Sequence, residues 1–249
     1  MFEFLNRRSD RRKYINRVVV VFLDYCSTGS GFFVNKEGKL ITCFHVAFGK
    51  DMKQLRKDEE FLKIKGDEPA KLREYYDRRL IRAEVEFADG SKAPAELKDF
   101  DPSHDIAAFE IKGKREHIRP CKIDWNHRLD YGEKVNFGGF PEHWDYKREQ
   151  APFAVQEGMV SAFVETTIGG DRYEHIQINS LTLQGNSGAP LFRGRSNKVV
   201  GVINGTMEWN IDNTGLKDAG GRPLRATLKT PLPVAYATPI RFLKKFINQ

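Results

Sequence analysis

Residues 183–192 read LQGNSGAPLF: small residues surround Ser187, and the chain then returns to apolar sequence. Gly, Asn and Ser are common turn formers, so the stretch by itself indicates a turn that leads into a β-strand. A serine between two glycines is also a place where a nucleophile can be held, because glycine adopts backbone conformations that a Cβ resists. The rest of the chain has to decide between the two interpretations.

The same alternation of turn and apolar run recurs along the whole sequence. Runs such as RVVVVFL (17–23), DIAAFEI (105–111) and KVVGVING (198–205) are separated by turn signals, without regular helix–strand alternation and without an internal repeat. About a dozen such runs predict an all-β fold made of two antiparallel barrels. We expect the first barrel over about residues 18–115 and the second over about 130–240, within one domain of residues 18–249.

Three segments break this pattern. Residues 50–80 carry apolar residues at helical spacing and predict an inserted helical pair, in which Asp67 caps and Pro69 starts the second helix. Residues 207–232 are rich in Gly, Asn, Asp and Pro, which predicts a long loop. Residues 240–248 predict a closing helix. The apolar positions behind the helical predictions are Met52, Leu55, Leu62, Leu72, Tyr75, Tyr76 and Leu80 in the insert, and Ile240, Leu243 and Ile247 at the end.

Charge is concentrated at the beginning of the chain. The formal net charge is +7, and the first 17 residues hold six basic and two acidic side chains, so the remainder is nearly balanced. We therefore expect a solvated basic arm over residues 1–17 and no nucleic-acid-binding face. The apolar run VVVVFL is too short for a membrane span, and we expect no membrane association.

Cysteine usage is sparse, with Cys26, Cys43 and Cys121 as the three cysteines of the chain. An odd, low number is consistent with a reducing compartment, so we expect a cytoplasmic protein. The spacing of the cysteines and histidines fits no zinc motif, so we expect no metal site and no cofactor.

A catalytic serine needs a histidine to take its proton and a carboxylate to orient that histidine. His45 stands at the exit of the run LITCFHV, and Asp105 begins the run DIAAFEI. Their order, His45, Asp105 and Ser187, allows a first barrel to supply the acid and base and a second to supply the nucleophile. The backbone N–H groups of Gly185 and Ser187, with Asn186 between them, then predict an oxyanion hole.

The motifs as a set resemble those of trypsin-like serine peptidases of the chymotrypsin fold, in particular the protease domain of the HtrA/Deg type. The resemblance rests on TGSGFFVNKEGKLITCFHV (28–46), DPSHDIAAFEI (101–111) and LQGNSGAPLF, and it covers most of residues 17–245. It implies two six-stranded barrels with the site between them, with His45, Asp105 and Ser187 at the catalytic positions. Two departures from this type are expected: no PDZ-type segment follows the closing helix, and the insert after His45 is longer than the family needs.

The resemblance also assigns a pocket for the P1 side chain, the residue whose carbonyl is attacked. This pocket maps to Leu181, Thr182, Ile203, Asn204, Gly205 and Thr206. None of these residues is acidic, which disfavours Arg or Lys at P1, and residues 203–206 include no histidine, which disfavours Glu. The prediction is therefore a small or medium aliphatic P1 residue, because a pocket without a charge cannot offset the desolvation of a charged side chain.

The leading hypothesis is a serine endopeptidase that cleaves protein or peptide substrates through an acyl-enzyme, with narrow or gated specificity that leaves room for a regulatory partner or trigger. The alternative is a catalytically latent or inactive protease fold that serves as a peptide-binding scaffold. A third hypothesis, nucleic-acid binding through the basic arm, has only the arm in its favour. Covalent labelling of Ser187 distinguishes the first hypothesis from the second.

Overall fold

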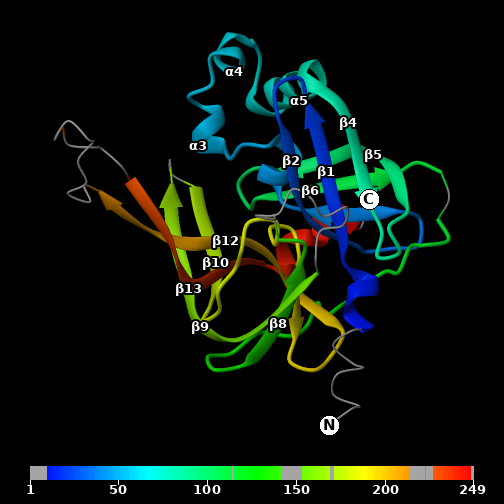
Figure 1. Cartoon of the computed structure of the whole chain (residues 1–249), viewed down its shortest axis with the longest axis vertical. Helices are drawn as coiled ribbons and strands as arrows, with labels where there is room; N and C mark the ends of the chain where they lie inside the picture. Colours follow the sequence, from blue (N-terminus) through cyan, green and yellow to red (C-terminus); the bar gives the residue numbers. More distant parts are fainter. Residues whose placement is uncertain are drawn as a thin grey trace.

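The computed structural model describes residues 10–113, 115–141, 153–168, 171–212, 222 and 227–247. Strands dominate, and they form two barrels packed side by side (Figure 1). The strands of the first barrel are β1 (Asn16–Phe22), β2 (Cys26–Phe33), β3 (Lys39–Thr42), β4 (Leu80–Glu86), β5 (Lys92–Asp101) and β6 (Ile106–Ile111). These six close in the order β1-β2-β3-β6-β5-β4, and every neighbouring pair is antiparallel.

The second barrel contains the turn around Ser187. Its strands are β8 (Lys134–Gly139), β9 (Ala154–Ile168), β10 (Asp171–Ile178), β11 (Pro190–Arg193), β12 (Lys198–Asp212) and β13 (Thr227–Pro239), with the short β7 (Lys122–Ile123) added in parallel to β12. The order β11-β8-β9-β10-β13-β12 closes through pairing of β11 with β12. The predicted pair of six-stranded antiparallel barrels is confirmed.

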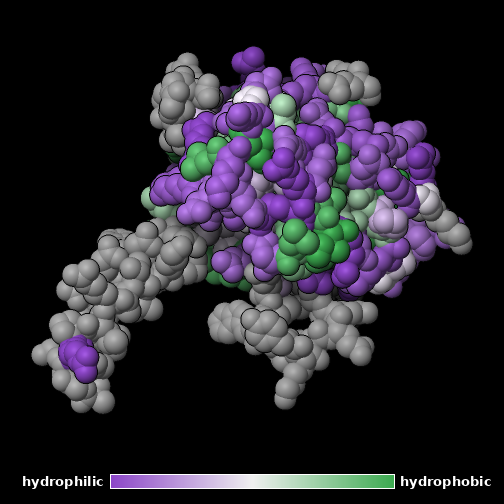
Figure 2. Space-filling model, turned by 90° about the horizontal axis from the view of Figure 1, so that it is seen from above, coloured by the Kyte–Doolittle hydropathy of each residue, from purple (hydrophilic) through white to green (hydrophobic). Residues whose placement is uncertain are grey.

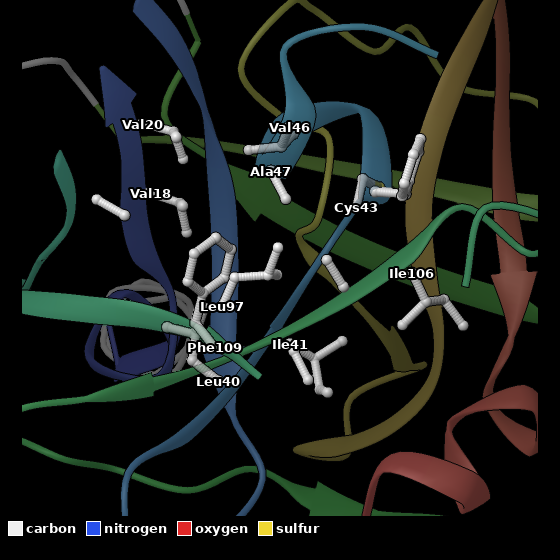
Figure 3. Packing of buried hydrophobic residues seen from close by; sticks show 14 of the residues in the cluster. Val18, Val20, Leu40, Ile41, Cys43, Val46, Ala47, Leu97, Ile106 and Phe109 are labelled. Carbon is white, nitrogen blue, oxygen red and sulfur yellow. The ribbon is translucent and has the colours of Figure 1, made fainter. Parts of the chain in front are cut away.

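Alternation along the strands explains the barrel interiors. Strand β1 alternates between buried and half-buried residues, as expected for a strand with one face in a core. Figure 3 shows side chains from β1, β3, β5 and β6 converging inside the first barrel, among them Val18, Leu40, Leu97 and Phe109. A separate cluster that includes Phe137, Ile176 and Leu191 fills the second barrel. Each barrel is therefore a packed core.

The insert contains three helices, not the predicted pair: α3 (Met52–Leu55), α4 (Glu59–Lys63) and α5 (Glu68–Arg79). The reason is that Asp51, Asp58 and Asp67 each accept backbone N–H groups at a separate helix start. Asp67 caps α5 as expected, and Pro69 lies in its first turn. Leu62 is 60% exposed, and its neighbour Phe61 fills the core position instead.

The part of the basic arm that is described belongs to the fold. A 3₁₀-helix, η1 (Asp10–Tyr14), precedes β1. Arg11 is only 7% exposed, because its guanidinium donates to the carbonyl oxygens of Gly194 and Ser196 and lies over the ring of Phe192. The expectation of a solvated arm is wrong for Arg11, since a guanidinium that satisfies backbone carbonyls is held by the second barrel, whereas Arg12 and Lys13 are exposed as expected.

The predicted loop over residues 207–232 is also wrong in part. Residues 208–212 of β12 pair with residues 227–231 of β13, so much of the segment is a long hairpin that projects from the second barrel (Figure 1). Strand pairing overrides the turn-rich composition here. Residues 213–221 and 223–226 lie outside the described residues.

The chain then closes with a 3₁₀-helix, η2 (Ile240–Leu243), followed by α6 (Lys244–Ile247). Ile240, Leu243 and Phe246 are buried. The view down onto the insert shows mainly hydrophilic residues, with hydrophobic ones in small separate areas (Figure 2). None of the helices in the described part of the chain is long and apolar enough to cross a membrane.

Candidate functional site

His45 lies on a short helix, α2 (Phe44–Phe48), that follows β3 directly. Phe44 and Phe48 stack on each other at 4.2 Å between ring centroids and are both buried. The helix ends at Gly49, whose φ of 68° is left-handed. The buried phenylalanines thus anchor α2, and the imidazole of His45 stays partly exposed at the boundary between the barrels.

Asp105 precedes β6 and fixes His45 by two hydrogen bonds. Its Oδ1 accepts the backbone N–H of His45 at 2.9 Å, and its Oδ2 lies 2.8 Å from Nδ1 of the imidazole. Burial opposes the charged imidazole, but the charge of Asp105 and its hydrogen bond prevail, so the pKa of His45 is raised above 6.5. Asp105 itself has a φ of 54°, which a residue other than glycine seldom adopts. The chain accepts this strained conformation where the carboxylate meets the histidine.

The neighbouring Asp101 does something different. Its Oδ1 accepts from the backbone N–H of Ser103, and its Oδ2 contacts His104 at 2.6 Å and Lys245 at 2.6 Å. His104 also stacks on the ring of Phe242. Asp101 is therefore a turn-capping residue that ties the closing helix to the first barrel.

Ser187 occupies the middle of two linked turns. The N–H of Asn186 donates to the carbonyl of Leu183 at 3.1 Å, with Gly185 at φ 93° in the third position, and the N–H of Ala189 donates to the carbonyl of Asn186 at 3.0 Å, with Gly188 at φ 87° in the third position. Each is the pattern of a type II turn, which requires a positive φ at that place. The glycines beside Ser187 are thus dictated by backbone geometry.

The turns also decide which N–H groups are free. The N–H of Asn186 is used inside its turn, and its side chain is fully buried, so Asn186 shapes the predicted oxyanion hole without donating a hydrogen bond to it. The N–H groups of Gly185 and Ser187 donate to no acceptor among the described residues. They remain available to bind a ligand oxygen.

Ser30 on β2 joins the first barrel to these turns. Its N–H donates to the carbonyl of Ser187 at 2.8 Å, and its Oγ donates to the carbonyl of Gly185 at 2.7 Å. The carbonyl of Ser30 accepts from Thr42 Oγ1, and an added Cβ at Gly188 would collide with both groups. Ser30 is fully buried. Its role was missed at the sequence level, where the motif Gly29-Ser30-Gly31 was recognised only as a family signature.

The serine turn and α2 approach each other across Gly29. A Cβ at Gly29 would come within 2.6 Å of Val46 Cγ2 and 3.0 Å of the carbonyl oxygen of Ser187. The backbone of Ser187 thus lies close to the helix of His45. Among the described residues, however, no hydrogen bond joins the hydroxyl of Ser187 to His45. Hydrogen bonds of this kind often tighten only when substrate is bound, so the geometry is compatible with either an active or a latent site.

A cavity of about 710 Å³ opens beside His45 and Asp105. It is bounded by the first barrel, by the start of the insert and by the second barrel, where Asn204 and Gly205 of β12 contribute to the wall. A space of this size lies in the range of ligand-binding clefts. It joins the His45–Asp105 pair to the edge of β12.

The remaining residues predicted for the P1 pocket do not line this cavity. Thr182 is 4% exposed and lies next to Asn186, whose Nδ2 approaches its Oγ1 at 3.4 Å. Leu181 is 41% exposed. The side chain of Ile203 is buried in the second barrel, while its backbone N–H and carbonyl bond to Ala189 and Gly188. Thr206 donates to the carbonyl of Val234 at 3.2 Å.

One further group was missed by sequence reasoning. The thiol of Cys43 is fully buried, donates to the carbonyl of Ile203 at 3.2 Å and has a pKa raised by burial and by the nearby Asp105. Cys43, His45 and Asp105 offer metal-ligand atoms within 4.8 Å of one another. Nδ1 of His45 and both oxygens of Asp105 are occupied by their mutual hydrogen bonds, so the arrangement serves to hold the imidazole.

Curated relatives match part of the chain. A probable periplasmic DegP-like serine endoprotease of Pseudomonas putida strain F1 is 27% identical over 176 residues, which is 71% of this chain and 28% of the relative. Serine protease HTRA1 of Xenopus laevis is 26% identical over 184 residues, which is 71% of this chain and 31% of that protein. The chain thus spans under a third of the length of these relatives.

Solved structures agree on the fold. Deg5 superposes with a TM-score of 0.63 at 19% identity, covering 98% of this chain and 91% of that chain. The HtrA-type protease AlgW with a tripeptide superposes with a TM-score of 0.64 at 18% identity, covering 98% and 62%. The expected resemblance to the HtrA/Deg type is confirmed.

The expectation of a cytoplasmic location is wrong, because several of the matching curated relatives are named as periplasmic. Cysteine count is a poor guide here. Cys43 and Cys121 are buried and behave as small apolar side chains, which is compatible with an oxidising or a reducing compartment.

The family model described as the trypsin-like peptidase domain matches residues 29–202. The match begins at Gly29, which lies between α2 and the turn of Ser187, and it includes His45, Asp105 and Ser187. With the two barrels and the geometry at their junction, the match shows that this chain belongs to the family of trypsin-like peptidase domains.

Proposed function

We propose that the chain is a serine endopeptidase in which His45, Asp105 and Ser187 are the catalytic residues. The observation that carries the proposal is the doubly bonded His45–Asp105 pair, which faces a cavity and belongs to a region that the backbone of Ser187 approaches across Gly29. A hydrogen bond to Nδ1 orients the imidazole and leaves Nε2 to take a proton. His45 can thus act as the general base that a serine hydroxyl needs in order to attack a carbonyl.

In the proposed reaction the hydroxyl oxygen of Ser187 attacks the substrate carbonyl while His45 takes its proton. The free N–H groups of Gly185 and Ser187 bind the oxyanion that forms. The proton then passes from His45 to the leaving amine, which departs and leaves an acyl-enzyme. Water then attacks this ester while His45 takes its proton, and His45 returns the proton to the oxygen of Ser187 as the carboxylic acid departs.

The test is covalent labelling with a fluorophosphonate probe. Wild-type protein is expected to be labelled, and Ser187→Ala is expected to lose the label. Ser103→Ala is the control, because Ser103 lines the cavity beside His104 and offers a second hydroxyl to the probe. Labelling that survives in Ser187→Ala contradicts the assignment of the nucleophile.

The alternative function, a latent protease fold that binds peptides, has one observation in its favour: the absence of a hydrogen bond between Ser187 and His45 in the described part of the chain. Labelling separates the two proposals. A protein that binds peptides but is not labelled under any condition is a scaffold, and one that is labelled after peptide is added is a latent protease.

For the P1 residue we propose a small or medium aliphatic side chain. Neither Leu181 nor Thr182 carries a charge, and the segment Ile203–Thr206 has no acidic residue, so a charged P1 side chain would lose its hydration without gaining a partner. A peptide set that varies only P1 tests this. Preferred cleavage after Arg or Glu contradicts it.

We also propose a periplasmic location, in keeping with the names of the Pseudomonas relatives. Fractionation of cells that produce the full-length protein, followed by detection in the periplasmic and cytoplasmic fractions, tests this directly.

A further inference from the structure

The residue before Asp105 is held by the second barrel. Thr238 lies near the end of β13 and is 1% exposed, and its hydroxyl donates to the carbonyl oxygen of His104 at 2.8 Å. The amide of Asn204 donates to the same hydroxyl oxygen at 2.9 Å. A hydroxyl has a single proton to donate, and here that proton is directed to His104. The barrel that contains Ser187 thus binds the loop of residues 101–105, which carries Asp105.

The position of this hydrogen bond matters because of the backbone at Asp105. The carbonyl of His104 and the N–H of Asp105 belong to one planar peptide group, so a bond to the carbonyl oxygen fixes the plane next to Asp105. The φ of Asp105 is 54°, in the left-handed region. A residue other than glycine stays in such a conformation only where its surroundings hold it there. The hydroxyl of Thr238 supplies such a restraint at the adjacent peptide group.

The closing segment, residues 240–247, holds the same loop through side chains. The imidazole of His104 stacks on the ring of Phe242 at 3.9 Å between centroids, and its Nδ1 lies 2.6 Å from Oδ2 of Asp101. Lys245 pairs with the same carboxylate oxygen at 2.6 Å. Although burial opposes it, the hydrogen bonds of Lys245 and His104 hold the pKa of Asp101 below its ordinary value, so Asp101 stays a carboxylate. The loop is therefore restrained at its first residue as well as at His104.

The closing segment is itself fixed to both barrels. Arg241 forms an ion pair with Glu174 of β10, and Lys39 of β3 donates to the carbonyl of Phe246 at 2.6 Å. Residues 102–105 line the cavity beside His45, whereas neither Thr238 nor the closing segment does. They can therefore hold the loop without touching a ligand in that cavity.

A displacement of Asp105 would change His45. The two oxygens of Asp105 bond to the backbone N–H and to Nδ1 of His45. Burial opposes the charged imidazole, while the charge and hydrogen bond of Asp105, followed by the charge of Asp51 in the insert, raise the pKa of His45. A carboxylate that moves away from the ring removes the main raising contribution and leaves that of Asp51. The pKa of His45 therefore reports the position of Asp105.

We propose that Thr238 is a positioning residue: with the closing segment, it holds the loop of Asp105 in the conformation from which the carboxylate orients His45. The proposal rests on the proposed endopeptidase function. It assigns to the end of the chain a role in the geometry of the site.

The experiment compares two substitutions of one residue. Thr238→Val keeps the shape of the side chain and removes the hydroxyl, and Thr238→Ser keeps the hydroxyl and removes the methyl group. We expect kcat on a cleaved peptide to fall about tenfold in Thr238→Val with KM unchanged, because misplacing a group by about 1 Å can cost about 100-fold. The pKa of His45, followed by NMR, should fall as well. Thr238→Ser should restore both values, although it loses buried methyl packing.

Lys245→Met tests the restraint from the closing segment. It removes the charge that faces Asp101, and we expect a severalfold loss of kcat and a smaller fall in the pKa of His45. Lys244→Met is the matched control, because Lys244 is the exposed residue immediately before Lys245. It should leave both values unchanged. The side chain of Lys245 is 49% exposed, so this pair of variants serves if Thr238→Val does not fold.

A folded Thr238→Val protein with the kcat and the His45 pKa of wild type overturns the proposal while the endopeptidase function stands. Equal losses in Thr238→Val and Thr238→Ser also overturn it, because they indicate packing alone. If Thr238→Val does not fold, equal values in Lys245→Met and Lys244→Met overturn the proposal.

If the wild-type protein neither cleaves peptides nor reacts with the fluorophosphonate probe, the endopeptidase function fails and the NMR titration decides. A pKa of His45 that falls in Thr238→Val and is restored in Thr238→Ser supports the positioning role without turnover. An unchanged pKa overturns it.

Discussion

The two halves of the site are held by different forces. In the first barrel, the carboxylate of Asp105 positions His45 through hydrogen bonds to its ring and its backbone. In the second barrel, Ser187 is positioned by backbone turns with glycines at positive φ. One half therefore depends on side-chain charge and protonation, and the other on the absence of a Cβ. A substitution that removes the charge of Asp105 should therefore leave the turns around Ser187 intact, and one that adds a Cβ to those turns should leave the His45–Asp105 pair intact.

The largest effect is expected from Asp105→Asn, which attacks the charged half. An amide cannot stabilise the imidazolium and favours the wrong tautomer, which in triads of this kind costs about 10⁴-fold in kcat. The measurement is kcat on a cleaved peptide together with the rate of fluorophosphonate labelling. The serine turn should be untouched, so the fold measured by circular dichroism should be retained. A loss below tenfold in a folded protein contradicts the role of Asp105.

Gly188→Ala adds a Cβ to one of the two backbone turns that position Ser187. A positive φ costs about 1–2 kcal/mol for alanine, and the new Cβ would also press against the carbonyl of Ser30 and the hydroxyl of Thr42. We expect the free energy of unfolding to fall by more than about 2 kcal/mol, with loss of labelling, because displacement of that turn moves Ser187. Denaturant titration measures the first effect.

Gly132→Ala distinguishes the cost of a positive φ from the cost of the contact that a new Cβ makes with its neighbours. Gly132 has a φ of 73°, but a Cβ there meets nothing within 4 Å. It should show only the cost of the positive φ, about 1–2 kcal/mol, with labelling intact. Equal losses in the two variants would mean that the contact with Ser30 and Thr42 contributes nothing.

Ser30→Ala tests the connection between the halves. Its hydroxyl donates to the carbonyl of Gly185 and accepts the N–H of Phe140 at 3.2 Å, and both groups would lose a buried partner. An unsatisfied buried polar group costs about 1–3 kcal/mol, so we expect a loss of stability in that range and slower labelling. Ser161→Ala is the control, because Ser161 is an exposed serine that accepts a hydrogen bond from Gln177. No difference between the two variants contradicts the bridging role.

The same contrast explains what the sequence predicts and what it does not. The barrels follow from alternation and turn residues, which are local signals, and the positions of His45, Asp105 and Ser187 follow from the motifs around them. The link through Ser30 and the contact of Cys43 with Ile203 join residues more than 150 positions apart, and no local pattern encodes them. Periodicity also failed in the insert, where caps at Asp51 and Asp58 divided one expected helix into two.

Charge patterns were the least informative. Arg11 was counted with a solvated arm, yet it satisfies carbonyls of the second barrel, because burial of a guanidinium depends on acceptors that folding brings near. The function of Asn186 within the predicted oxyanion hole is similarly hidden from the sequence. Its N–H is used by the turn that positions its neighbours, which only the backbone geometry reveals.

The smallest expected effect is a shift in pH dependence, which belongs to the charged half alone. The charge of Asp105 and its hydrogen bond outweigh burial and raise the pKa of His45 above 6.5, and catalysis needs the neutral imidazole. Labelling should therefore increase with pH through an inflection above 6.5. Because the folded-state pKa is the higher one, the stability that this pair contributes is full below about pH 6.5 and is lost as pH rises through the folded value.

Two variants identify the group that titrates. Asp105→Asn should move any residual inflection to lower pH, since the partner charge is gone and burial then dominates. His175→Gln should leave the inflection in place, because burial lowers the pKa of His175 and its titration lies on the opposite side of 6.5. NMR titration of the imidazole resonances checks the assignment without turnover. A wild-type His45 that titrates at or below 6.5 would mean that burial outweighs Asp105, and the charged half of the site would then be no better organised electrostatically than an isolated histidine.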